Sequence, residues 1–344
     1  MSRIVLRIGD VASWRLRPRS LLVLAALLSC CVAAAITELS VGAIQIAPGD
    51  VVRALVGDAG EIIEKVVVHW RLPRVTLGLL FGAALGLAGA VLQSLTRNPL
   101  GSPDIIGFDA GAYTGAVVSI LVLQGSVGVI PSAVAGGTIT AALVYVLAYK
   151  RGVQGFRLIV VGIAITSLAG AVNSYLILKA NLFQAQMAAL WGAGSLNGVA
   201  WSDVRTAVPS LALGVAILAW LGPRMRFLEM GDDAARALGI DAERTRVGLM
   251  LAGVTLSATV TAICGPIAFV SLAAPQIALR LTRAPGVQLL PSAVCGAALL
   301  VGCDVLGANA FGQILPVGLV TVSVGGVFLV LLLVAEAKKE IRWS

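Results

Sequence analysis

GPRMRFLEMGDDAARALGIDAERTRV, residues 222–247, is the most highly charged stretch of the chain. Ten of its residues carry a charge, whereas Asp, Glu, Lys and Arg make up only 12% of the whole sequence. Long apolar runs flank the stretch at 211–221 and 248–263. A polar segment between two such runs is typical of a membrane protein that presents it to water between two spans.

Helix signals within this stretch predict two short helices. Asp232 and Asp233 suit the positive N-terminal end of a helix. Gly239 is a typical helix stop, and Asp241 can cap a second helix that follows it. Two short helices joined by a glycine would form a compact docking element, and a solvated loop without a partner is the alternative.

The composition of the whole chain excludes a soluble globular protein. The chain is 58% hydrophobic with a mean hydropathy of +0.97, and soluble domains carry about 25% charged residues. The apolar runs are continuous rather than alternating, which excludes a membrane β-barrel. At about 20 residues per membrane helix, the sequence predicts an all-α polytopic protein with about ten spans, at 20–38, 73–95, 105–123, 130–149, 157–178, 206–222, 247–263, 265–282, 289–306 and 314–335.

The net charge of +8 is distributed unevenly over this predicted topology. With residues 1–19 as a cytoplasmic tail, 19 of the 25 Lys and Arg residues lie on the cytoplasmic side. An excess of Lys and Arg in cytoplasmic loops is the usual orientation signal. The sequence therefore predicts that both termini are cytoplasmic, and the basic charge indicates orientation in a lipid membrane and no nucleic-acid partner. The six basic residues predicted outside are Arg53, Lys65, Arg71, Arg74, Lys179 and Arg205.

Catalytic and metal-binding residue patterns are missing from the sequence. The five cysteines form no C-x-x-C pair, and His69 is the single histidine. No lysine precedes Ser or Thr as in a phosphate-binding P-loop. The sequence predicts no catalytic residue, no metal site and no cofactor in this chain, so ATP-driven transport would need the ATPase of another chain.

Two arginines stand at the predicted outer end of the second span. Arg71 and Arg74 are three residues apart and would share one face of a helical turn, with Pro73 in the first turn of the span. One interpretation is a basic contact for a soluble partner. The alternative is interfacial anchoring of two long side chains.

A rigid cytoplasmic turn is predicted after the second span. Arg97, Asn98 and Pro99 begin it, and Asp104 is positioned to cap the third span. Asp109 follows near the predicted membrane end, where we expect a hydrogen-bonded residue rather than a proton relay.

Several motifs, in this order along the chain, resemble those of the FecCD or BtuC-like family, the permeases of bacterial ABC importers for iron–siderophores and vitamin B12. Within that family the sequence is most similar to ferric-enterobactin permease subunits, which pair with a second, different permease. The motifs are Arg71-Leu72-Pro73-Arg74, Gln93 with the run from Arg97 to Asp104, Gly194-Ser195-Leu196, Gly265-Pro266-Ile267, Ala274-Pro275-Gln276 and Leu315-Pro316-Val317-Gly318.

The resemblance implies a single permease domain over 1–344, in the bacterial inner membrane, that carries a ferric siderophore. It implies a second permease subunit, two ABC ATPases that bind ATP and Mg, and a substrate-binding protein. The translocation path would be lined by the fifth and tenth helices. Arg71 and Arg74 match family positions that meet acids of the binding protein. Residues 223–246 would hold the coupling helices, with Glu229, Met230, Gly231, Asp232, Asp233, Ala235, Arg236, Leu238 and Gly239 as the ATPase-coupling residues.

The sequence departs from the family pattern at Gln276, where His is usual, at Ile314, where an acid is usual, and at 308–310, where a basic residue is often found. Two alternative functions stay open. One is a permease for another large chelate, such as cobalamin or heme. The other is an ion-coupled secondary transporter, which would need paired intramembrane acids, and only Asp109 and Asp304 are candidates.

Overall fold

The computed structural model describes residues 4–8, 12–16, 18–42, 44–124, 126–149, 155–310 and 314–341. Two strands, β1 (Ile4–Ile8) and β2 (Ala12–Leu16), form an antiparallel hairpin before the first long helix. The helices are α1 (Pro18–Ser40), α2 (Pro48–Leu55), α3 (Glu61–Glu64), the π-helix η1 (Lys65–Arg71), α4 (Leu72–Thr96), α5 (Pro103–Ile106), α6 (Phe108–Leu121), α7 (Val129–Ala148), α8 (Gly155–Lys179), α9 (Leu182–Gly192), α10 (Trp201–Glu229), α11 (Asp232–Ala237), α12 (Ala242–Cys264), α13 (Val270–Thr282), α14 (Leu289–Asn309) and α15 (Val317–Ile341).

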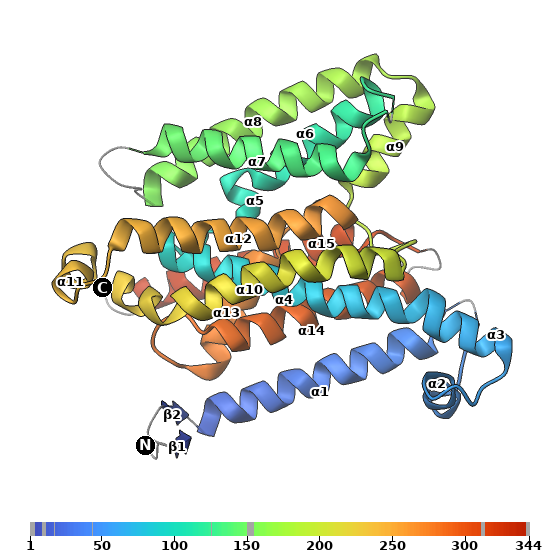
Figure 1. The fold of residues 1–344 in the computed structure, drawn as a ribbon, viewed down its shortest axis with the longest axis horizontal. Coiled ribbons are helices and arrows are strands. Elements are labelled where there is room, and N and C mark those ends of the chain that lie inside the picture. Colours follow the sequence, from blue (N-terminus) through green and yellow to red (C-terminus); the bar gives the residue numbers. More distant parts are fainter. Residues whose placement is uncertain are drawn as a thin grey trace.

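Each apolar run predicted as a span falls on a helix, so the predicted helical membrane fold is confirmed. Among the described residues, seven helices are long and apolar enough to cross a membrane, and α6 and the start of α15 are shorter apolar helices. In Figure 1, α6 to α9 form one layer, α1 lies on the opposite side, and α4, α10 and α12 to α15 lie between them.

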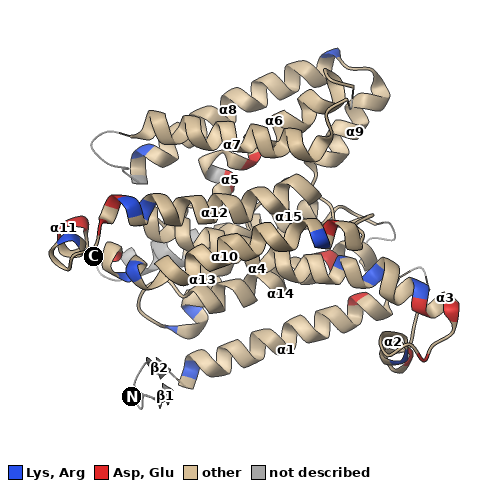
Figure 2. Cartoon of the chain, in the orientation of Figure 1, with Lys and Arg blue, Asp and Glu red and all other residues tan. Residues whose placement is uncertain are grey.

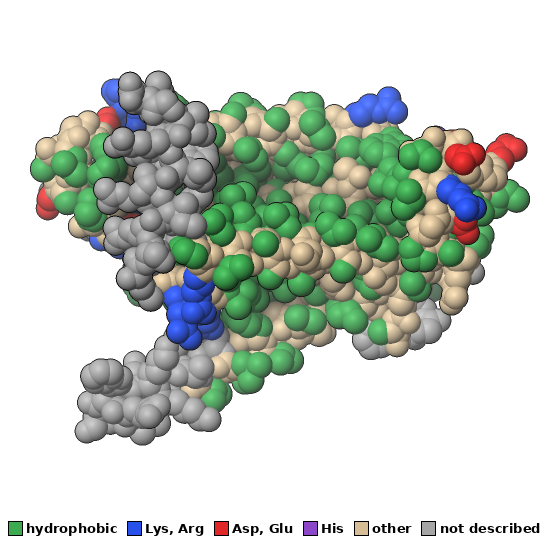
Figure 3. All heavy atoms as spheres, turned by 90° about the horizontal axis from the view of Figure 1, so that it is seen from below, with side chains coloured by type: hydrophobic (Ala, Val, Ile, Leu, Met, Phe, Trp, Pro, Cys, Tyr) green, Lys and Arg blue, Asp and Glu red, His purple; other side chains and the backbone are tan. Residues whose placement is uncertain are grey.

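Charged residues gather at the two ends of the bundle and leave its middle almost free of charge (Figure 2). We call these the α11 end, where α1 begins and α15 finishes, and the α2 end, which carries α2, α3 and α9 (Figure 1). The face that carries α1 is mostly hydrophobic between the two ends (Figure 3). An apolar belt between two charged ends is the surface that a bilayer requires.

Small residues bring α4 close to α14. The second span carries glycines four residues apart at 78, 82 and 86, a pattern that favours close helix packing. A Cβ atom at Gly82 would overlap the backbone of Gly296, and one at Gly86 would overlap the carbonyl oxygen of Ser292. Backbones this close bury most of the α4 surface. This contact makes α4 the central helix of the fold.

The second span begins earlier than predicted. Pro73 lies in the first turn of α4, as predicted, but α4 continues a helical stretch that starts at Glu61. The π-helix η1 precedes α4. Proline has no N–H to donate to the preceding turn, and a π-turn shifts the hydrogen-bond pairing there.

The eighth span is also different from the prediction at 265–282. Its helix, α13, begins only at Val270 and has 13 residues, or about 20 Å at 1.5 Å per residue. Gly265 and Pro266 interrupt the helix, and the chain from 265 to 269 covers the remaining depth outside a helix.

The sequence predicts that Asp104 caps the third span, but in the structure it does not. Its carboxylate accepts hydrogen bonds from the backbone N–H of Phe269 at 3.2 Å and from the hydroxyl of Ser271 at 3.1 Å. Phe269 has φ +69° and precedes α13. The acid therefore caps α13 and ties the turn after α4 to it.

The hairpin β1–β2 is an addition to the predicted all-α fold, because the sequence predicts no strand and only a cytoplasmic tail at residues 1–19. Its strands pair Ile4 with Leu16 and Ile8 with Ala12. Isoleucine and valine in the first strand favour an extended backbone.

Candidate functional site

The charged stretch forms a single short helix at the α11 end instead of two. The last turns of α10 continue to Glu229, α11 spans Asp232–Ala237, and the predicted second short helix is the beginning of the long α12. The predicted cap is confirmed, since the Asp241 carboxylate accepts the backbone N–H of Arg244 at 3.0 Å. We refer to residues 230–241 as the α11 knob.

Gly239 ends α11 as predicted, and the geometry explains why. Its φ is +76°. The N–H of Ile240 donates to the carbonyl oxygen of Ala235 at 3.0 Å, and the N–H of Gly239 donates to that of Arg236 at 2.9 Å. These two bonds form a Schellman motif, in which the residue at this position takes a left-handed backbone. Gly231, with φ +118°, gives the chain a similar freedom at the start of α11.

Ion pairs hold the knob against the bundle. The Arg246 guanidinium of α12, with only 9% of its side chain exposed, donates to the Asp232 carboxylate at 2.7 Å. Arg97 approaches the same oxygen at 3.6 Å. The hydrogen bond from Arg246, together with the nearby positive charges, lowers the pKa of Asp232 below its ordinary value. Asp232 therefore anchors the knob.

The predicted cytoplasmic turn packs beside the knob. Arg97 has φ +49° and donates to the carbonyl oxygen of Leu228, near the end of α10, at 2.9 Å. The Asn98 side chain accepts the backbone N–H of Leu100 at 2.9 Å, which stabilises the turn around Pro99. The structure thus brings the turn at 97–99 next to the α11 knob, although the two lie far apart in the sequence.

The predicted coupling residues divide into an inner and an outer set. Glu229, whose carboxylate accepts the Ser94 hydroxyl at 2.9 Å, and Ala235, which is fully buried, belong to the inner set with Asp232. The outer set is exposed and combines apolar with charged side chains: Met230, Asp233, Arg236, Leu238 and Gly239, with Pro99 of the adjacent turn. An anchored knob with exposed apolar side chains is suited to insertion into a groove of another protein.

We expect Asp232→Asn to loosen the knob by about 1–2 kcal/mol, because Arg246 loses the nearer of its two carboxylate partners and keeps only Glu243 at 3.4 Å. The cost stays moderate because 35% of the Asp232 side chain is open to solvent. Hydrogen exchange of residues 230–240 should become faster. Asp233→Asn is the matched control, because Asp233 is fully exposed, and it should leave exchange unchanged.

The lowered pKa of Asp232 determines how the stability of the knob depends on pH. A carboxylate whose pKa is lowered by folding stabilises the folded state above its ordinary pKa, about 3.9, and loses this contribution only as the pH falls through the lower folded value. The protection of the knob should therefore be the same at pH 6 and pH 8 after correction for intrinsic exchange. A decrease over this range, or equal exchange in the Asp232→Asn and Asp233→Asn variants, would contradict the anchoring role.

At the α2 end, the predicted docking arginines have partners within the chain. Arg71 donates to the carbonyl oxygens of Leu39 at 2.7 Å and Ile44 at 2.6 Å. Arg74 binds the Asp304 carboxylate through two hydrogen bonds, at 2.7 and 2.8 Å, and approaches Glu38 at 3.2 Å. Their role in docking stays a prediction.

The ion cluster Glu38–Arg74–Asp304 was not predicted from the sequence. It joins α1, α4 and α14, and only 6% of the Glu38 and 3% of the Asp304 side chain is exposed. The available signal was the presence of two isolated acids at the ends of apolar runs. Sequence spacing alone did not indicate which arginine would neutralise them.

Three of the sequence motifs meet at the α2 side of the core. The N–H of Ser195 donates to the carbonyl oxygen of Cys264 at 2.7 Å, and that of Gly318 donates to Gly194 at 2.9 Å. A Cβ atom at Gly194 would overlap the carbonyl oxygen of Pro266. These motifs therefore encode close backbone packing between loops far apart in the sequence.

Two further buried polar groups have partners on neighbouring helices. The Gln276 amide donates to the Gln93 side chain at 2.7 Å, which in turn donates to the carbonyl oxygen of Leu272. Asp109 is buried and accepts hydrogen bonds from Thr261 at 2.8 Å and Ser257 at 3.2 Å. It is hydrogen-bonded, as expected, and its partners are hydroxyl groups of α12.

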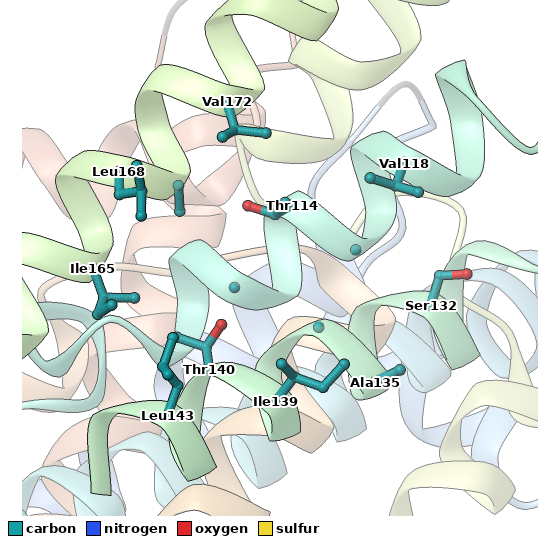
Figure 4. A pocket seen from close by; sticks show the side chains of 14 residues that line it. Thr114, Val118, Ser132, Ala135, Ile139, Thr140, Leu143, Ile165, Leu168 and Val172 are labelled. Carbon is teal, nitrogen blue, oxygen red and sulfur yellow. The ribbon is translucent and has the colours of Figure 1, made fainter. Parts of the chain in front are cut away.

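A cavity of about 450 Å³ lies between α6, α7 and α8 (Figure 4). Its lining is mostly apolar, with Val118, Ile139, Leu143, Leu168 and Val172 around the opening. The adjacent helix α8 is the fifth span and exposes many large hydrophobic side chains. Among the described residues, no group of three or more His, Cys, Asp or Glu side chains is arranged to hold a metal ion.

Comparisons with known proteins match nearly the whole chain. A sequence model of the FecCD transport family matches residues 27–335. The chain is 46% identical over 316 residues to the ferric enterobactin transport system permease protein FepG of Escherichia coli K12, covering 91% of this chain and 96% of that protein. It is 36% identical over 332 residues to the Fe(3+)-citrate import system permease protein YfmE of Bacillus subtilis 168, covering 95% and 98%. A solved structure of a metal-chelate type ABC transporter in an inward-facing conformation has a TM-score of 0.79 at 26% identity, covering 91% of this chain and 99% of that one.

Proposed function

The chain belongs to the FecCD transport family, and from this premise we propose that it is a permease subunit of an ABC importer that moves an iron(III)–siderophore complex across the bacterial inner membrane. The observation that carries the proposal is the 46% identity to a ferric enterobactin permease over nearly the full length of both chains. Iron is cargo here, and the chain needs no metal site of its own.

Energy for transport is supplied by a separate ATPase, which binds ATP and Mg. The α11 knob docks into a groove of that ATPase through the exposed side chains of Met230 and Leu238, while Asp232 and Arg246 hold the knob in place. A rigid connection to α10 and α12 then transmits movement of the ATPase to the helices of the permease. Two ATPases and a second permease subunit complete the membrane complex.

The substrate-binding protein docks at the α2 end. Arg71 is the better of the two predicted contacts, because its guanidinium binds neutral carbonyl groups and keeps its positive charge uncompensated by hydrogen-bonded acids. Arg74 already has two carboxylates beside it. An acid of the binding protein would have to compete with both of them.

An ion-coupled secondary transporter is a weaker interpretation. Its two candidate acids do not form a pair: Asp304 binds Arg74, and Asp109 binds two hydroxyl groups on α12. Coupled transport would need acids that gain and lose an ion on a pathway.

The proposed function is tested by uptake in a strain that lacks this gene. Uptake of radiolabelled ferric enterobactin should be lost and restored by a plasmid copy, and depletion of ATP should abolish it. Ferric hydroxamate and cobalamin uptake serve as controls for the substrate class. Loss of cobalamin uptake with normal ferric enterobactin uptake would instead support the alternative chelate, and uptake driven by an ion gradient without ATP would contradict an ABC importer.

Orientation in the membrane gives a separate prediction. Leu238, in the α11 knob, and Val56, beside α2, lie at opposite ends of the bundle and are similarly exposed, at 58% and 74%. Each is replaced by cysteine in a separate variant. The exposed Cys30 is replaced by serine, and the chain is expressed without its ATPase, since the proposed groove would cover residue 238. A membrane-impermeant maleimide should label the Val56→Cys chain in intact cells and the Leu238→Cys chain only after permeabilisation. The reverse pattern would place the termini outside.

A further inference from the structure

A second, smaller cavity lies at the α11 end, where α1 and α14 begin and α10 finishes. Its volume is about 290 Å³, and its lining includes Ser20, Leu21, Leu24, Arg226, Gln288 and Leu290. Its lining includes Arg226, from the predicted coupling stretch 223–246, but none of the residues of the α11 knob and neither of the two docking arginines.

The cavity lies at the level where the apolar belt meets the charged end. Leu21 and Leu290 are exposed, and the long apolar helix α1 is almost unburied along its span. Arg19 lies two residues before Leu21, and its Nε donates to the carbonyl oxygen of Leu281, at the end of α13, at 2.8 Å. An arginine next to exposed leucines at the end of a span is at the depth of lipid headgroups.

The charge around this cavity is positive. Arg226 lines it, Arg19 lies beside it on α1, and Arg283 precedes the lining residues of the loop before α14. All three side chains are exposed. The one acid at the end of α10, Glu229, does not line the cavity: its Oε1 accepts the Ser94 hydroxyl, and its Oε2 lies close to Gly286 in the loop before α14. Figure 3 shows basic side chains beside the apolar surface at this end of the α1 face.

The lining of the cavity matches a molecule with one anionic and one apolar part. Leu21, Leu24 and Leu290 offer an apolar surface, whereas Arg226 and Ser20 offer hydrogen-bond donors. Arginine suits phosphate because its planar fork can donate two parallel hydrogen bonds. In addition, no side chain caps the first turn of α14, so its N–H groups add to the positive potential.

We propose that this cavity binds an anionic glycerophospholipid, with the phosphate at Arg226 and Arg19 and an acyl chain along Leu21, Leu24 and Leu290. Basic pockets between membrane helices at the membrane surface bind such headgroups through the combined effect of charge and buried acyl surface. The lipid would fill the space between α1 and α14 and fix the first span to the bundle. Its position in the cytoplasmic leaflet rests on the proposed orientation, whereas binding itself does not.

The test is native mass spectrometry of the purified full-length chain in detergent, with phosphatidylglycerol or phosphatidylcholine of the same acyl chains. The wild-type chain should retain more phosphatidylglycerol than phosphatidylcholine. Arg226→Gln should weaken that retention about fivefold, because one basic residue contributes roughly 1 kcal/mol to binding of an anionic lipid. Arg224→Gln is the matched control: it removes the same charge two residues away, where Arg224 lies over the Trp220 ring outside the cavity lining.

Three results would overturn the proposal. The first is equal retention of the two lipids by the wild-type chain. The second is unchanged retention in the Arg226→Gln variant, or a loss of the same size in Arg224→Gln. The third is complete displacement of the lipid by excess inorganic phosphate, which would show that the site binds the phosphate group alone and that the acyl chains contribute nothing to binding. Since Arg226 is exposed, the variant should fold, and its thermal unfolding midpoint in detergent without lipid should equal that of the wild type.

Discussion

Replacement of Arg74 by methionine is expected to destabilise the folded chain by about 3–5 kcal/mol, because it leaves the buried carboxylates of Asp304 and Glu38 without their cation. Breaking a buried ion pair from one side is more costly than losing the pair, since the remaining charges keep their desolvation penalty. The thermal unfolding midpoint in detergent should fall by about 5–10 °C. Less of the chain should reach the membrane as a consequence.

A rescue variant separates structural loss from loss of docking. Glu38→Gln and Asp304→Leu, combined with Arg74→Met, remove all three charges of the cluster, and replacement of a whole buried ion cluster by neutral side chains is often close to neutral in stability. The triple variant should therefore regain most of the lost stability. An unfolding midpoint as low as that of the single variant would contradict the ion cluster as the cause.

Binding of the substrate-binding protein by the rescued variant then decides what Arg74 does. Normal affinity would assign Arg74 to the internal cluster alone. A stable triple variant without affinity would instead establish Arg74 as a docking residue. Arg71→Ala is the comparison, because it removes hydrogen bonds to the carbonyl groups of Leu39 and Ile44 and leaves no buried charge. Arg71→Ala should destabilise the chain less than Arg74→Met does. If Arg71 contacts the substrate-binding protein, the variant should also weaken that binding, and by a larger factor at low salt than at high salt.

The helical membrane fold could be predicted from the sequence because it depends on one strong signal. A run of about 20 apolar residues has few other stable structures, since a bilayer forces its backbone groups into a helix. The ends of the helices were less predictable. Pro73 and the Gly265–Pro266 pair both indicate helix boundaries. Pro73 does lie in the first turn of α4, but the π-helix η1 extends the helical stretch back from it. Local sequence does not contain the neighbouring helices that make such a π-helix possible.

The knob shows a similar division between local and long-range signals. Its start at Asp232, its end at Gly239 and the cap at Asp241 were predicted, because each depends on residues within one or two turns. Its anchoring was not predicted, because Arg97 reaches Asp232 from the turn after α4 and Arg246 reaches it from α12. The cluster around Arg74 was missed for the same reason, since its members come from α1, α4 and α14. Contacts across such distances are set by the packing of glycine-rich helices, and spacing in the sequence does not reveal them.

Replacement of Gly239 by valine is expected to abolish iron–siderophore uptake while the permease still folds and inserts. Gly239 has φ +76° and ends α11 in a Schellman motif. A left-handed backbone costs a residue with a Cβ atom about 1–2 kcal/mol, and a β-branched residue more. Since no atom of the chain lies within 4 Å of a Cβ at this position, the strain falls on the backbone of the knob alone. The knob would then change shape where we propose that it meets the ATPase.

The measurements are uptake in cells and ATP hydrolysis by the reconstituted complex. Basal hydrolysis should persist, because the ATPase belongs to other chains, but its stimulation by the binding protein should be lost. Gly239→Asn should keep a large part of both activities, because asparagine tolerates a left-handed backbone better than other residues with a side chain. This graded series connects the loss of coupling to one backbone angle.

Gly57→Val is the matched control for this series. Gly57 has φ +78°, would have no atom within 4 Å of an added Cβ, and lies beside α2 at the other end of the bundle. Valine there imposes the same backbone strain far from the ATPase, so stimulation of hydrolysis by the binding protein should survive in that variant. Because Gly57 lies at the end where we propose that the binding protein docks, affinity for the binding protein is measured in parallel. Equal loss of stimulation in the two variants, with that affinity intact, would mean that strain alone inactivates the permease. Normal uptake by the Gly239→Val chain would show that the α11 knob does not couple transport to ATP, because a strained docking element cannot fit the same groove unchanged.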